Sequence, residues 1–107
     1  MSTPRCTTMT QVRDEIDRLD REIVRLLAQR EQRIVDAGHI KQSRDTVRDE
    51  ARIEDVVAKV RATATANGAD ADIVEGIYRD MMERYIAHEF TVWDDAAGSA
   101  EKGKARA

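Results

Sequence analysis

The sequence predicts an all-α protein of one domain, and two observations carry this prediction. Of its 107 residues, 36% are charged and only 4% are aromatic, and the chain has one proline and five glycines. A composition that is also rich in alanine, glutamate and arginine favours helices over strands. The second observation is an apolar stripe with helical spacing, which continues for about seven turns without a proline.

The first predicted helix covers Thr10–Lys41. Thr8 and Gln11 have the spacing of a capping box at its start. A helix of this length measures about 47 Å, whereas a compact 100-residue domain has a radius of gyration of about 13 Å. The rest of the chain is too short to cover it, so we expect an obligate homodimer. At ~100° per residue its apolar residues share one face; they are Val12, Ile16, Leu19, Ile23, Leu26, Leu27, Ile34 and Ala37.

Two further helices are predicted after the first. The polar segment Gln42–Arg48 reads as a loop, and a second helix follows over Asp49–Ala66. Asn67-Gly68 can adopt the left-handed conformation that ends a helix. Asp70 can cap a third helix, for which we expect an end near Asp95.

The ends of the chain lack a clear apolar period. We expect residues 1–7 to be a flexible N-terminus and residues 8–95 to form the helical domain. The small and charged residues 96–107 predict a disordered tail.

Charged residues interrupt the apolar stripes at three positions. Arg30 falls near the centre of the first stripe, and Lys41 lies within about 20° of it. Glu89 falls within the large side chains of the third helix. A buried charge needs an opposite charge and hydrogen bonds. Either acidic side chains neutralise the two cations, or their site binds an anionic ligand.

Composition argues against several functional classes. A net charge of −3 with mixed signs does not suit a nucleic-acid surface. Cys6 is the single cysteine, and no ligand spacing indicates a metal site. No apolar run has membrane-spanning length, and the start of the chain lacks a signal-peptide pattern. We therefore expect a cytoplasmic protein without cofactor or metal.

Several motifs resemble the all-helical chorismate mutase family. They are Arg13-Asp-Glu-Ile-Asp-Arg-Leu-Asp, Arg30, Lys41, Val47-Arg48-Asp49, Arg52 and Tyr85-Ile86-Ala87-His88-Glu89. The resemblance spans roughly residues 8–94 and implies three helices in an intertwined homodimeric bundle. It implies that Arg30, Lys41 and Glu89 are catalytic. It further implies that Arg13 from the partner chain, Asp49, Arg52 and Tyr85 bind the dicarboxylate substrate, chorismate.

Three positions depart from the family pattern. Glu89 replaces a glutamine common in bacterial members, and a carboxylate there would repel the negative charge that develops on the substrate. We therefore expect Glu89 to act in its protonated form, as a donor. Ile53 follows Arg52 where many members have glutamate, and Tyr85 replaces a serine.

The last two departures, together with Trp93, also resemble the isochorismate pyruvate lyases, which share this fold. Chorismate mutase is the preferred interpretation, partly because Asp49 fits it, and isochorismate pyruvate lyase is the alternative. A non-catalytic helical dimer is a second alternative. It leaves the charges at Arg30, Lys41 and Glu89 unexplained, because coiled coils favour apolar residues at such positions.

Overall fold

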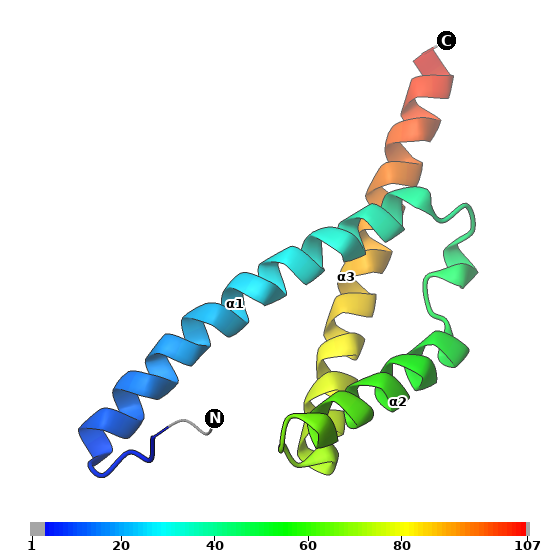
Figure 1. The fold of residues 1–107 in the computed structure, drawn as a ribbon. Helices are drawn as coiled ribbons and strands as arrows, with labels where there is room; N and C mark the ends of the chain where they lie inside the picture. Colours follow the sequence, from blue (N-terminus) through cyan, green and yellow to red (C-terminus); the bar gives the residue numbers. More distant parts are fainter. Residues whose placement is uncertain (1–3, 107) are drawn as a thin grey trace. The chain divides into compact units, whose positions relative to one another are not determined.

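The computed structural model describes residues 4–106, and side chains as far as residue 98. The described residues form three α-helices and one 3₁₀ turn, without a strand: α1 (Met9–Ile40), η1 (Arg44–Thr46), α2 (Glu50–Ala66) and α3 (Ala71–Arg106) (Figure 1). The all-α prediction is therefore confirmed. The chain divides within α1 into two compact units, Met1–Gln32 and Arg33–Ala107, which we call the first and second unit.

The first unit is the long N-terminal part of α1. Its start is the predicted capping box: the Gln11 amide donates to Thr8 Oγ1 at 3.1 Å, and the Thr8 amide donates to Gln11 Oε1 at 3.3 Å. The helix begins at Met9, one residue before the predicted start. The large apolar side chains of this unit are mostly exposed; they include Ile16, Leu19, Ile23 and Leu26, each about half exposed.

The second unit has its core between α2 and α3. Ile53 and Val57 of α2 are buried against Met82 of α3. Asp49 is the N-cap of α2, and its side chain accepts a hydrogen bond from the Arg52 amide. The predicted turn after α2 is confirmed, because Gly68 has a φ of 75°, a conformation that favours glycine.

Ion pairs join α2 and α3 along their whole shared length. Near the turn, Arg61 binds Asp72 at 2.9 Å and Glu75 at 2.8 Å. Further along, Arg79 of α3 binds Glu54 of α2 at 2.8 Å. These contacts fix the axial position of one helix against the other.

The end of α3 differs from the prediction. The helix ends at Arg106 and not near Asp95, whereas the disorder predicted for residues 96–107 stays a prediction. The alanines at 96, 97, 100 and 105, with neighbouring Glu, Lys and Arg, have high intrinsic helix propensity, and the prediction gave this too little weight. Of the N-terminal segment, residues 1–3 lie outside the described residues, and its flexibility stays a prediction.

No helix within the described residues combines the length and the apolar character needed to cross a bilayer.

Candidate active site

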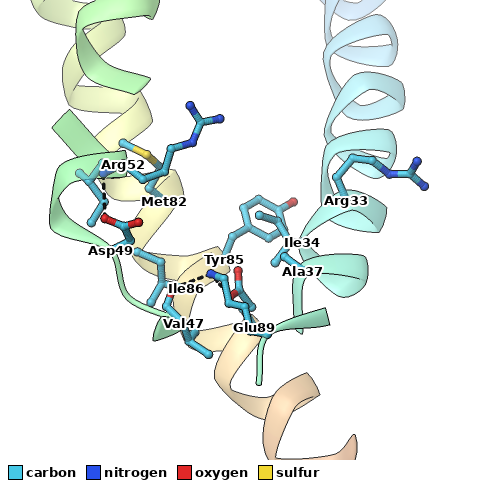
Figure 2. A pocket seen from close by; sticks show the side chains of 12 residues that line it. Arg33, Ile34, Ala37, Val47, Asp49, Arg52, Met82, Tyr85, Ile86 and Glu89 are labelled. Atoms are coloured by element: carbon cyan, nitrogen blue, oxygen red, sulfur yellow. Dashed lines mark hydrogen bonds and ion pairs between the residues drawn. The ribbon is translucent and has the colours of Figure 1, made fainter. Parts of the chain in front are cut away.

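A pocket of about 390 Å³ opens in the second unit. The end of α1, the segment around η1, the start of α2 and the middle of α3 all contribute to its wall (Figure 2). Its lining mixes apolar and charged side chains: Arg33, Ile34, Ala37, Lys41, Val47, Asp49, Arg52, Ile53, Met82, Tyr85, Ile86 and Glu89. Five of the seven predicted site residues are among them.

Lys41 and Glu89 form the polar centre of this pocket. Lys41 Nζ lies 2.6 Å from Glu89 Oε2 and donates a second hydrogen bond to the Val47 carbonyl at 3.1 Å. The Glu89 side chain is 5% exposed and that of Lys41 28% exposed. Lys41 is therefore paired with an acid of its own chain, and Glu89 is the buried acid that its place in the stripe predicts.

Asp49 and Arg52 lie at the exposed edge of the pocket. Asp49 Oδ1 accepts a hydrogen bond from the Arg52 amide at 3.0 Å, and the Arg52 guanidinium pairs with Asp55 at 2.6 Å. Figure 2 shows the guanidinium groups of Arg52 and Arg33 pointing away from the Glu89 carboxylate. Both Asp49 and Arg52 therefore have structural partners, and their substrate contacts stay predictions.

Tyr85 is half-buried in the wall of the pocket. Its ring extends from α3 toward Ile34 and Ala37 of α1 (Figure 2). Arg13 and Arg30 belong to the first unit, where Arg13 is exposed and Arg30 is half-buried. Their part in the site stays a prediction.

Arg48 joins the loop to α3 beside the pocket. Its guanidinium forms two hydrogen bonds of 2.8 Å with the Glu83 carboxylate and one of 2.6 Å with Glu50. These hydrogen bonds raise the pKa of Arg48, and the contribution of Glu83 is the largest. The same contact lowers the pKa of Glu83 below its ordinary value of 4.5. Arg48 therefore clamps the start of α2 onto α3.

Three contributors to the site were not predicted from sequence. The Val47 carbonyl is a ligand of the Lys41 ammonium, and Val47 itself is 3% exposed. The Trp93 indole N–H donates to the Lys41 carbonyl at 2.9 Å. Gly38 is buried against Val92 of α3. A glycine inside a long helix was the one available signal, because such a residue often marks a close backbone approach.

The site offers orientation and fixed charge. Among the described residues, no group of three His, Cys, Asp or Glu side chains is placed to hold a metal ion. Lys41 can donate hydrogen bonds to an anion, and Glu89 can accept them or, when protonated, donate one. The pocket has room for a small organic molecule between these groups and the apolar wall.

Two comparisons with known proteins identify the family of this chain. The family model for chorismate mutase type II matches residues 12–90. A curated isochorismate pyruvate lyase from Pseudomonas aeruginosa is 32% identical over 101 residues, which cover 94% of this chain and 100% of the lyase. The match includes the first helix and every element that lines the pocket, and the chain belongs to the type II chorismate mutase family.

Proposed function

We propose that the protein is a chorismate mutase, which rearranges chorismate to prephenate. The observation that carries this proposal is the Lys41–Glu89 pair, buried at the centre of a pocket in a chain of this family. A lysine ammonium so placed can donate hydrogen bonds to a substrate oxygen in the pocket.

The reaction requires no nucleophile. Chorismate carries two carboxylates and an ether bridge, and in one concerted step the ether C–O bond breaks while a C–C bond forms within the same molecule. Catalysis therefore consists of holding the compact conformer and stabilising negative charge on the ether oxygen. Lys41 would donate to this oxygen, and Arg30 and Arg13 of the partner chain would bind the carboxylates.

Glu89 has a second part in this proposal. Its side chain pairs with the Lys41 ammonium, and a charged carboxylate beside the ether oxygen would oppose the charge that develops there. A protonated Glu89 would instead donate a hydrogen bond to that oxygen. We expect activity to fall as the pH rises and the Glu89→Gln variant to have a flatter pH–rate profile. An identical profile in the variant would contradict the role of Glu89.

The proposal includes a homodimer in the cytoplasm. Its support is the exposed apolar face of the first unit, which includes Ile16, Leu19, Ile23 and Leu26. A monomer seldom leaves such a long apolar face in water. A second copy of the chain would bury this face and bring the partner's arginine to the site.

A second candidate is isochorismate pyruvate lyase. It is supported by the relative of that name, which the chain matches over that relative's whole length, and by Tyr85 and Trp93, which resemble lyase residues. In this reaction isochorismate would lose pyruvate by a related concerted step and give salicylate. The same cations would bind the substrate in both cases, so the pocket alone does not separate them.

The deciding experiment offers chorismate and isochorismate separately and compares kcat/KM for prephenate and for salicylate. The proposal expects prephenate formation to dominate. Salicylate dominating by more than about tenfold, a difference of ~1.4 kcal/mol in transition-state stabilisation, would favour the lyase. A protein without either activity, and without a rise in Tm on addition of a dicarboxylate transition-state mimic, would be the non-catalytic dimer.

A further inference from the structure

The end of α1 and the residue that follows it are held by one face of α3. Three successive contact positions on α3 take part: Glu89, Val92 and Trp93. These residues are three and four apart and therefore lie on one side of the helix. Figure 1 shows the end of α1 passing beside the orange part of α3.

Trp93 holds the main chain of Lys41. Lys41 directly follows the last residue of α1, Ile40, and carbonyl groups at a helix C-terminus have no partner within the helix. The indole Nε1–H of Trp93 supplies the partner for the Lys41 carbonyl at 2.9 Å. This hydrogen bond fixes the point from which the Lys41 side chain departs.

Glu89 holds the other end of the same residue. It lies one helical turn before Trp93, about 6 Å along the axis, and binds the Lys41 ammonium at 2.6 Å. Lysine side chains have many rotamers, and ordering one costs entropy. With carbonyl and ammonium both held by α3, few of these rotamers remain.

Gly38 allows the two helices to approach closely enough for these contacts. A Cβ atom at this position would lie 2.8 Å from Val92 Cγ1 and 3.4 Å from the Glu89 carbonyl oxygen. The first of these distances is far below van der Waals contact. The missing side chain therefore places the backbone of α1 within reach of the Trp93 indole.

We propose that Trp93 is a positioning residue, whose indole N–H fixes the Lys41 backbone and so directs the Lys41 ammonium onto Glu89 in the pocket. Its effect on catalysis rests on the proposed function, but its effect on the ammonium does not. The Trp93→Phe variant removes the N–H and keeps an aromatic ring.

The first measurement is NMR of protein with ¹⁵N-labelled lysine, in which hydrogen exchange of the Lys41 ammonium with water is followed. We expect clearly faster exchange in Trp93→Phe than in the unsubstituted protein. The control is Val57→Ala, which weakens the α2–α3 core without touching Lys41 and should leave this exchange unchanged. Equal exchange rates in Trp93→Phe and the unsubstituted protein would overturn the proposal.

A second measurement avoids the risk that Trp93→Phe fails to fold. Trp93 is the single tryptophan of the chain, so its indole N–H gives one assignable ¹⁵N signal. The signal should exchange slowly with water in the unsubstituted protein and stay slow in Lys41→Met, which keeps the acceptor carbonyl. Rapid exchange of the indole proton in the unsubstituted protein would show that the hydrogen bond is absent and would overturn the proposal.

Kinetics extend the test to catalysis. With whichever substrate proves active, Trp93→Phe should lower kcat by about tenfold with a smaller change in KM, because a misplacement of about 1 Å can cost roughly 10²-fold and a smaller displacement is expected here. An unchanged kcat beside faster ammonium exchange would overturn the catalytic part. Absence of turnover in the unsubstituted protein would instead count against the proposed function, and the two NMR results would still decide the role of Trp93.

Discussion

The N-terminal part of α1 and the α2–α3 pair both carry apolar side chains at helical spacing, but they differ in how far these side chains are buried. In α2, Ile53 and Val57 are buried against α3. In the first unit, Ile16 and Leu26 remain 50% and 53% exposed. An isolated amphipathic helix gains little stability without packing of its apolar face. The comparison indicates that α2 and α3 bury part of their apolar surface against each other, although Ile73 and Ile77 of α3 are exposed. The stripe of the first unit is exposed along its length, which is why we propose a second copy of the chain as its cover.

The largest expected effect comes from placing a charge on the exposed stripe. Leu26→Glu should prevent assembly and abolish activity, because an unpaired carboxylate would be buried in the proposed dimer interface. Ala28→Glu is the matched control, since this exposed residue lies roughly 150° from the stripe centre. Sedimentation should give half the mass for Leu26→Glu only. A dimer of Leu26→Glu, or a monomer of the unsubstituted protein, would contradict this assignment.

The next effect concerns the charged centre of the second unit. Lys41→Met should lower kcat/KM by about 10²–10³-fold, the usual loss when one preorganised donor to a developing oxyanion is removed. It should also destabilise the protein by about 2 kcal/mol, because Glu89 is left buried without its partner. Adding Glu89→Gln should restore part of the stability and none of the activity. Denaturant titration and steady-state kinetics measure the two effects, and recovery of activity in the double variant would refute the assignment of Lys41.

A smaller effect is expected from alanine substitutions at two glycines within helices, which should change stability in opposite directions. Gly38→Ala should destabilise the protein by about 1–3 kcal/mol, since its Cβ would overlap Val92 and the helices would have to move apart. Gly76→Ala, where nothing lies within 4 Å of the added Cβ, should stabilise α3 by about 0.5–1 kcal/mol. Thermal unfolding gives both values. Adding Val92→Ala to Gly38→Ala should recover part of the loss, and equal effects of the two glycine substitutions would contradict the close approach at Gly38.

The smallest effect is the response of the α2–α3 pair to acid. Hydrogen bonds from Arg79 and Arg48 lower the pKa values of Glu54 and Glu83 below 4.5. Carboxyls with a lower pKa in the folded protein stabilise it above the unfolded pKa, and this contribution is lost as the pH falls through the folded pKa. Tm should therefore decrease as the pH falls below about 4.5. Arg79→Gln should reduce the slope, and an equal slope in this variant would show that its ion pairs do not contribute.

Sequence reasoning worked best where the signal is local and periodic. The capping box at Thr8, the turn at Gly68 and the three helices follow from patterns a few residues long. Glu89 was recognisable because a carboxyl within an apolar stripe requires a partner. Its partner, Lys41, was identified in the same way, as a charged residue within an apolar stripe. The two charged residues at the centre of the pocket were therefore recognisable from the sequence.

The remaining contributors were not predictable for a physical reason. The Val47 carbonyl is a backbone group, and the Trp93 indole donates to one, the Lys41 carbonyl. Every residue has such groups, so the sequence does not show which of them take part. Asp49 is the N-cap of α2, and its substrate contact stays a prediction, because an acid at a helix start satisfies either role. The end of α3 was misjudged because a short alanine-rich segment has helix propensity without an apolar period.

The geometry of the turn at Gly68 also affects how accurately the Glu89 carboxylate is positioned in the distant pocket. Glu89 lies about 30 Å along α3 from that turn. A small rotation of α3 about Gly68 therefore becomes a large displacement at Glu89. A rotation of about 5° at Gly68 would move the carboxylate by about 2–3 Å at this length, enough to break its contact with Lys41. The ion pairs of Arg61, Arg79 and Arg48 are spaced along α3 and would each restrict that rotation. Surface pairs that add little to stability singly would thus contribute alignment, which a measurement of unfolding free energy alone does not detect.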